Sequence, residues 1–266
     1  MRAQSRAQRL RRGIVLVGVV LILAFAASSA FDVWRSYEQS LEAVDRELSN
    51  LAKALAAEAE RRFQSIDVVL RDAESWFGTR PRRLSPSAAA EVLGRLGSGL
   101  PVAAIYITDA AGNLVYSSDP LPPEVVSAAP RNLVLLDGHH VLVISRELRD
   151  ARAPAGRVNA LLQLSAFREL YDAVELSPGN TIALYSDDGT LLARRPNAPE
   201  RIGWKFEQWL DLVEDIRQQE QAAPKRAPVV ASPVDGRLRF RSLAPVRGFP
   251  FSVMTTREET DRKSVV

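Results

Sequence analysis

The segment from Trp34 to Phe77 contains neither proline nor glycine, so no residue in it interrupts a helix. Apolar residues recur there at steps of three and four, which is the spacing of one face of an α-helix. This stripe consists of Leu41, Val44, Leu48, Leu51, Leu55, Ala59, Phe63, Ile66, Leu70, Ala73 and Phe77. The pattern predicts one helix roughly 66 Å long. We expect it to end at Gly78 and Pro81.

Two interpretations of this stalk helix are open. In the first, its apolar face packs along the rest of its own chain. In the second, the helix pairs with a second copy of the chain. Both hold if the N-terminal half pairs and the C-terminal half packs, so we expect a homodimer through the stalk helix.

The segment before the stalk predicts a membrane anchor. Residues 13–31, GIVLVGVVLILAFAASSAF, carry no charge and span roughly 28 Å as a helix, close to the hydrocarbon thickness of a bilayer. Residues 1–12 hold five arginines and no acid, which places them in the cytoplasm. The alternative is a cleaved signal peptide with Ser28 and Ala30 before the cut. We expect an uncleaved single-pass anchor, with everything after Phe31 outside the cytoplasm.

Composition excludes several classes of function. The sequence pI is about 9.4, but removing the five N-terminal arginines from 35 Lys and Arg leaves 30, against 32 Asp and Glu. No basic, aromatic-rich surface is expected, so we predict no nucleic-acid partner. The chain has no cysteine, which excludes disulfides and thiol catalysis. It has neither a G-x-S-x-G nor an H-E-x-x-H motif, and we do not expect an enzyme.

Two stretches of the remaining sequence repeat each other. Residues 105–118 read IYITDAAGNLVYSS, and residues 182–195 read IALYSDDGTLLARR. Aligning Gly112 with Gly189, 77 positions later, places Leu114 opposite Leu191. Each stretch predicts a strand, a tight turn and a second strand.

Strand and helix patterns fill the region around the repeats. Helices are predicted over 85–96, 165–176 and 206–219. Strands are predicted over 102–108, 114–117, 133–136, 141–145, 158–164, 181–186, 191–194, 229–233, 238–245 and 251–255. The pattern indicates an α+β chain: a long helix followed by two units, each an antiparallel sheet with a helix beside it.

The order of these elements resembles the extracytoplasmic double Cache (PDC-type, PAS-like) sensor region of bacterial sensor histidine kinases, diguanylate cyclases and chemoreceptors. The likeness runs over about residues 13–255, through YITDAAGNLVYSS, VISRELRD, LLQLSAFRELYDAVEL, ALYSDDGTLLARRP and SPVDGRLRFRSLAPVRGFPFSV. FQSIDVVLRDAESWF is similar to the end of the long first helix in that group. The resemblance implies two PAS-like modules stacked along one helix. The outer module would hold the ligand, and the module next to the membrane would relay the change.

This resemblance divides the chain into six parts. They are a cytoplasmic basic tail (1–12), a transmembrane anchor (13–31), the stalk helix (32–78), a membrane-distal module (79–176), a membrane-proximal module (177–255) and a C-terminal tail (256–266).

The sequence departs from the family pattern in two places. DPLPPEVVSAAPR, residues 119–131, is proline-rich and shorter than expected where such proteins carry ligand-contacting loops, which argues against a conventional ligand site there. The family usually continues into a second transmembrane helix and an output domain, whereas this sequence ends at TTREETDRKSVV. We expect either the input half of a receptor or a sensor that acts through a separate signalling partner.

Four residues are candidates for ligand contact. Arg131 and Arg146 lie at the ends of predicted strands, and an arginine fork binds a carboxylate through two hydrogen bonds. Tyr106 or Tyr116 would close such a site. The alternative is that both arginines are surface residues at strand ends.

Metal chemistry is not predicted. His139 and His140 are adjacent in a strand, so their side chains point to opposite faces and do not share one metal. They are interpreted as exposed hairpin residues, with a pH-sensing role for one of them as the alternative. The sequence DDG at 187–189 predicts a turn rather than a calcium loop, whose spaced acids are missing. No cofactor is expected.

The predicted function is a membrane-anchored extracytoplasmic sensor region. The resemblance implies that its anchor lies in the bacterial inner membrane and that its main domain is periplasmic or extracellular. This region would bind a small-molecule signal and transmit it through the long helix. The alternative is a membrane-tethered envelope module that binds a protein and no small molecule. A closed pocket in the distal module favours the sensor, and a filled core with an exposed patch favours the alternative.

Overall fold

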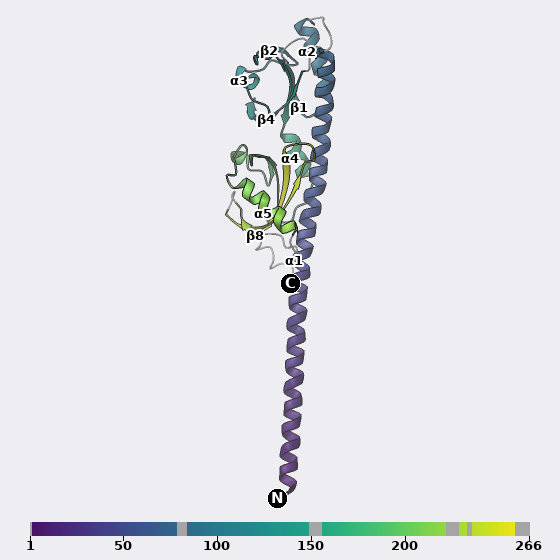
Figure 1. Ribbon diagram of the computed structural model, residues 1–266, viewed down its shortest axis with the longest axis vertical. Coiled ribbons are helices and arrows are strands. Elements are labelled where there is room, and N and C mark those ends of the chain that lie inside the picture. Colours follow the sequence, from purple (N-terminus) through teal and green to yellow (C-terminus); the bar gives the residue numbers. More distant parts are fainter. Residues whose placement is uncertain (1, 79–83, 149–155, 222–228, 233–235, 259–266) are drawn as a thin grey trace.

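The computed structural model describes residues 2–78, 84–148, 156–221, 229–232 and 236–258. It describes the side chains of these residues too, except at 2–20, 22–24, 37, 38, 40, 41, 78, 219–221, 229 and 230. One continuous helix, α1 (Arg2–Gly78), runs the length of the molecule, and two five-stranded antiparallel sheets lie beside its C-terminal half (Figure 1). The α+β prediction and the predicted helix end at Gly78 are confirmed.

Among the helices of the described residues, none is both long and apolar enough to cross a membrane. Most of the predicted anchor, residues 13–31, lies outside the residues whose side chains are described. The anchor therefore stays a prediction.

Sheet A lies far from the N-terminus (Figure 1). Its strands are β1 (Val102–Thr108), β2 (Leu114–Ser117), β3 (Leu133–Leu136), β4 (His139–Glu147) and β5 (Arg157–Gln163), in the order β2-β1-β5-β4-β3. α2 (Pro86–Gly97) precedes the sheet, and the short α3 (Pro123–Val126) lies in the proline-rich segment, where no helix was predicted.

Sheet B lies beside the middle of α1 (Figure 1). Its strands are β6 (Thr181–Ser186), β7 (Leu191–Arg195), β8 (Val229–Ala231), β9 (Leu238–Pro245) and β10 (Phe251–Glu258), in the order β7-β6-β10-β9-β8. α4 (Ser165–Asp172) leads from sheet A into sheet B, and η1 (Pro199–Arg201) and α5 (Trp209–Gln221) connect β7 to β8. The two sheets have the same topology, because their strands follow the chain in the same relative order.

The repeated hairpins are built alike in detail. Gly112 and Gly189 have φ of 87° and 86°, in the left-handed region that favours glycine. The N–H of Gly112 donates to the carbonyl of Asp109 at 3.0 Å, and the N–H of Gly189 donates to the carbonyl of Ser186 at 3.0 Å. Each pair of strands also shifts register at the same aligned position. The repeat predicted from the sequence is therefore a structural repeat.

Among the side chains of α1 that the structure describes, the first buried one is Leu48. The buried positions of this helix are Leu48, Ala52, Leu55, Ala56, Ala59, Phe63, Ile66, Leu70 and Ala73. The inner face of each sheet packs on this stripe, in agreement with the packing interpretation of the stalk. Val33 and Trp34, nearer the N-terminus, are exposed.

β10 extends three residues beyond its predicted end. Thr256, Arg257 and Glu258 pair with Arg241, Phe240 and Arg239 of β9. The polar sequence of these residues is typical of a tail, but a neighbouring strand supplies the partners for their backbone groups.

Candidate functional site

The outer face of sheet A, away from α1, is filled by its own side chains. Alternation along the strands brings a set of apolar residues to this face, where segment 121–128 covers them. The buried members are Ala104, Tyr106, Val125, Val141, Val143 and Leu161. Tyr106 is fully buried, and its hydroxyl donates to the carbonyl of Val125 at 3.4 Å. The side chain of this candidate residue therefore forms part of the core.

Burial of Tyr106 makes a pH effect testable. Burial raises the pKa of Tyr106 to about 12, because the phenolate loses its hydration. The protonated Tyr106 contributes its full stabilisation of the fold below pH 10, where the unfolded chain also keeps the proton. This contribution is lost as the pH rises to 12. Two pKa units correspond to about 2.7 kcal/mol. We expect the free energy of unfolding of Tyr106→Phe to fall less between pH 10 and 12 than that of the wild type. Denaturant titration at each pH measures this difference. Equal pH dependence in both proteins contradicts the assignment.

Arg146 lies on the opposite face of sheet A, toward α1. Its Nε donates to Glu74 at 2.5 Å and its Nη1 donates to Asp67 at 3.2 Å. The hydrogen bond to Glu74 raises the pKa of Arg146 more than burial lowers it. The negative charges of Glu74 and Asp67 raise this pKa further. Arg146 thus ties β4 to two carboxylates of the long helix.

Arg131 lies where sheets A and B meet. It has φ of 68°, and its guanidinium is 3.8 Å from Asp187, at the turn between β6 and β7. Arg131 lines a cavity of about 480 Å³, which we call the α1-side cavity. Its lining residues are Asp67, Pro130, Arg131, Ile144, Ser145, Glu147, Arg157, Gly248, Phe249, Pro250 and Phe251. Both sheets and α1 therefore contribute to its wall.

The structure brings two of the four candidates to one place. Arg131 lines the α1-side cavity, and Arg146 reaches it through Asp67. Tyr106 lies on the other face of sheet A. Tyr116 packs on Phe77, and its hydroxyl donates to the carbonyl of Leu84 at 3.1 Å. The two tyrosines do not face this cavity.

Two charged residues that line the α1-side cavity were not predicted from the sequence. Glu147 and Arg157 oppose each other across β4 and β5. Among the described residues, neither side chain has an ion-pair or hydrogen-bond partner. Within the described part of the chain, the cavity thus presents one carboxylate and one guanidinium that no other side chain engages. Glu147 and Arg157 lie ten positions apart in the sequence, and only the register of β4 with β5 brings them opposite each other.

A second cavity of about 480 Å³ lies between the sheets without an α1 residue in its wall; we call it the hairpin-side cavity. His139, His140 and Arg168 line it, together with Arg194 from β7. His139 is exposed, as predicted, whereas His140 is half-buried.

The DDG segment forms the predicted turn between β6 and β7. Desolvation alone would raise the pKa of Asp188, but hydrogen bonds from Ser186, Lys205 and Thr190 outweigh it and lower that pKa. In the part of the chain that the structure describes, no three His, Asp or Glu side chains gather to hold a metal ion.

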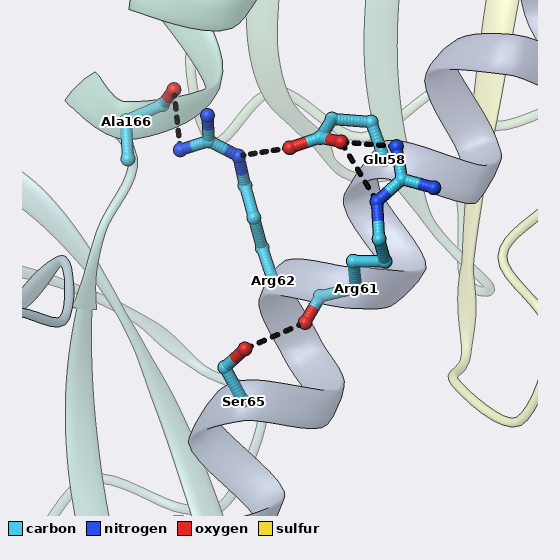
Figure 2. A network of polar contacts seen from close by, with 5 residues as sticks. All are labelled: Glu58, Arg61, Arg62, Ser65 and Ala166. Carbon is cyan, nitrogen blue, oxygen red and sulfur yellow. Dashed lines mark hydrogen bonds and ion pairs between the residues drawn. The ribbon is translucent and has the colours of Figure 1, made fainter.

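A polar network joins α1 to α4 between the sheets. Figure 2 shows Glu58 between Arg61 and Arg62, with Ser65 bonded to the carbonyl of Arg61 at 2.9 Å. Arg62 donates to the carbonyl of Ala166, in the first turn of α4, at 3.3 Å. This hydrogen bond connects the first turn of α4 to the long helix.

The other end of α4 is fastened to sheet B. Arg195 of β7 donates to the carbonyls of Tyr171 and Val174, and it lies 3.5 Å from Asp172. α4 therefore links the long helix to sheet B through polar contacts at both of its ends.

Comparison with known proteins agrees with this architecture. Residues 165–256 match the dCache_1_like family model, described as a histidine kinase sensor domain. No curated protein sequence matches the chain significantly. The family match covers α4 and most of sheet B and confirms the resemblance to Cache-type sensor domains.

Solved structures with this fold include sensor domains of two kinds. The extracellular domain of rpHK1S-Z16, described as a histidine kinase, has a TM-score of 0.64 and 27% identity, over 85% of this chain and 99% of that one. The ligand-binding domain of the Pseudomonas fluorescens chemoreceptor CtaA, in complex with L-isoleucine, has a TM-score of 0.58 and 19% identity. The match covers 85% of this chain and 96% of that one. The ligand-binding domain of the Pseudomonas aeruginosa amino acid chemoreceptor PctC, in complex with GABA, has a TM-score of 0.57 and 18% identity. The match covers 81% of this chain and 100% of that one.

Proposed function

We propose that this chain is the membrane-anchored extracytoplasmic sensor region of a signalling protein, and that it binds a small molecule of the amino-acid class in the α1-side cavity. The observation that carries the proposal is the wall of that cavity, to which sheet A, sheet B and α1 all contribute. Its volume of about 480 Å³ lies in the range of small-molecule sites. The chain would not act as an enzyme.

The charges of the cavity fit a molecule that carries both a carboxylate and an ammonium group. Arg157 and Arg131 offer guanidinium groups, and Glu147 and Asp67 offer carboxylates. The relatives CtaA and PctC were solved with L-isoleucine and GABA, which have both groups. The ligand would join the free charges of Glu147 and Arg157, which lie on sheet A, to the wall formed by sheet B.

Transmission would use the contacts of Arg146 with α1. A ligand shifts an equilibrium only by its differential affinity for the two states, typically about 1–3 kcal/mol. A ligand that repositions sheet A relative to sheet B would move Asp67 and Glu74 with Arg146. α1 would then shift as a rigid element toward the membrane.

The ligand proposal is tested on the full chain in detergent, with thermal unfolding measured against a panel of amino acids and GABA. We expect at least one compound to raise Tm, and Arg157→Ala to weaken that compound at least tenfold, because the guanidinium supplies charge-assisted hydrogen bonds. Arg168→Ala, in the hairpin-side cavity, is the matched control and should bind as the wild type does. No shift with any compound, or equal loss in both variants, would reject the α1-side site.

The alternative, a protein-binding module, has one observation in its favour. The outer face of sheet A is filled, and the edge strands β2 and β3 expose Leu114, Val115 and Leu135. This alternative predicts that no small molecule in the panel raises Tm.

We also propose that α1 pairs with α1 of a second copy below the sheets. Trp34 is exposed and precedes Leu41 of the apolar stripe by one heptad. Because the chain has no cysteine, a single Trp34→Cys substitution reports this pairing without background. We expect oxidation of Trp34→Cys in membranes to give a disulfide-linked dimer on a non-reducing gel. Asp32→Cys, about 200° away around the helix, is the control and should crosslink less. Equal crosslinking at both positions would argue against this interface.

A further inference from the structure

The hairpin-side cavity is as large as the α1-side cavity, at about 480 Å³, and lies in the size range of small-molecule sites. Its wall consists of the turn of the β3–β4 hairpin in sheet A, the end of β5 with the first turn of α4, and β7 with the segment that follows it. That segment meets sheet A, since a Cβ at Gly203 would lie 3.2 Å from the side chain of Leu133. A molecule in this cavity would therefore contact both sheets and α4.

The polar side chains of this wall are mostly hydrogen-bond donors. A guanidinium offers five N–H groups, and an imidazole offers at least one N–H whether or not it is protonated. Amide and hydroxyl groups add further donors. The donor side chains are His139, His140, Gln163, Ser165, Arg168 and Asn197. Among the described residues of the wall, Asp137 is the only one with a carboxylate.

These donors are available to a ligand. In the part of the chain that the structure describes, the half-buried side chains of His140 and Ser165 form no hydrogen bond, and the guanidinium of Arg168 forms neither a hydrogen bond nor an ion pair. Asp137 is exposed in the hairpin turn and does not pair with Arg168 in that part either. Arg194 also lines the cavity, but it already takes part in another interaction and is not one of the available donors.

The rest of the wall is apolar. Leu164 and Leu192 are buried, and Leu136 and Ile202 are half-buried. Displacing water from these side chains favours a ligand with an apolar body. An ammonium group on that ligand would find one carboxylate, that of the exposed Asp137. The wall therefore fits a molecule that has a negative charge and an apolar body and lacks an ammonium group.

We infer that the hairpin-side cavity binds an organic acid whose carboxylate is attached to an apolar body, such as an aromatic carboxylate. The guanidinium of Arg168 would bind the carboxylate through charge-assisted hydrogen bonds. His140 and Ser165 would donate further hydrogen bonds to it. α4 begins without a side-chain cap, and the dipole at its N-terminus adds to the attraction for negative charge.

The ligand would connect the two sheets on the side away from the α1-side cavity. Its carboxylate would bind His140 of sheet A and Arg168 of α4, and its apolar body would contact Leu192 of sheet B. α4 is itself bonded to the long helix, because Arg62 donates to the carbonyl of Ala166 at 3.3 Å. Occupation would therefore stabilise the present arrangement of both sheets and α4. This ligand is separate from the amino acid proposed for the α1-side cavity.

The test measures Tm of the full chain in detergent while sodium chloride is replaced by sodium benzoate at constant ionic strength. We expect benzoate to raise Tm with a half-saturating concentration in the millimolar range. Sodium acetate, which lacks the ring, and benzamide, which lacks the charge, should raise Tm less at the same concentration. A benzamide effect equal to that of benzoate would reject an anion site, and an equal acetate effect would reject the role of the apolar body.

Two variants change the charge of the wall in opposite directions. Arg168→Met removes the guanidinium and should raise the half-saturating benzoate concentration at least tenfold. Asp137→Asn removes the carboxylate and should lower that concentration; asparagine tolerates the left-handed φ of 49° at this position. Both residues are exposed, so both variants should fold. Arg217→Met, an exposed arginine of α5 outside both cavities, is the control and should leave the concentration unchanged.

Three outcomes would overturn the inference: benzoate does not raise Tm, Arg168→Met responds as the wild type does, or Arg217→Met loses as much affinity as Arg168→Met. The result is distinguishable from that of the amino-acid test, because the two ligands bind in different cavities. A failure of every amino acid to raise Tm would concern the α1-side cavity and leave the benzoate result standing.

Discussion

Phe63→Ala is expected to lower the free energy of unfolding by about 3–5 kcal/mol, the usual cost of removing a buried phenylalanine ring. Phe63 is 1% exposed and stacks on Phe251 of β10, with ring centroids 4.4 Å apart. It also contacts Phe167 of α4 at 5.3 Å and Phe249 at 5.2 Å. One side chain of the long helix therefore packs against α4 and against sheet B. The measurement is denaturant unfolding of the full chain followed by tryptophan fluorescence.

The control for this variant is Val68→Ala on the same helix. Val68 is 51% exposed, and alanine has the higher helix propensity, so a change within about 0.5 kcal/mol is expected. Phe249 and Phe251 also line the α1-side cavity, so Phe63→Ala should weaken amino-acid binding as well. A loss below 1 kcal/mol for Phe63→Ala would show that the sheets do not depend on this helix face.

Gly189→Ala is expected to cost about 3 kcal/mol or more, from two additive causes. At φ of 86°, any side chain strains the backbone. A Cβ at this position would also lie 2.5 Å from the Cβ of Trp209 and 2.8 Å from the carbonyl oxygen of Phe206. The start of α5 would have to move away from the hairpin. Denaturant unfolding measures the loss.

Gly112→Ala is the matched control, because the repeat supplies the same turn without the close contact. Gly112 has φ of 87°, and an added Cβ would meet no atom within 4 Å. The strain alone should cost about 1–2 kcal/mol. An equal decrease in the free energy of unfolding for both variants would mean that the start of α5 moves away from the hairpin at little cost. A larger loss for Gly189→Ala would show that α5 is held firmly against sheet B.

Much of the fold was predictable because its signals are local. The helix follows from a stripe at steps of three and four without proline or glycine, and its end follows from Gly78. β1, β2, β3, β6 and β9 have the predicted bounds, because apolar runs and turn residues mark both ends of each strand. α3 was missed because four residues in a proline-rich segment carry no periodicity. The end of β10 was missed because the ladder with β9, and not hydrophobicity, extends it.

The sequence by itself determined the long helix, the two copies of one hairpin and the α+β class, because each depends on spacing along a continuous stretch. The tertiary structure alone decided which side chains meet. The face of a strand and its register place Tyr106 in a core and direct Arg146 to Glu74 of α1, and the packing of the sheets brings His140 and Arg168 to one cavity. Charged residues far apart in sequence carry no local signal of their partners, since distance and burial set their electrostatics.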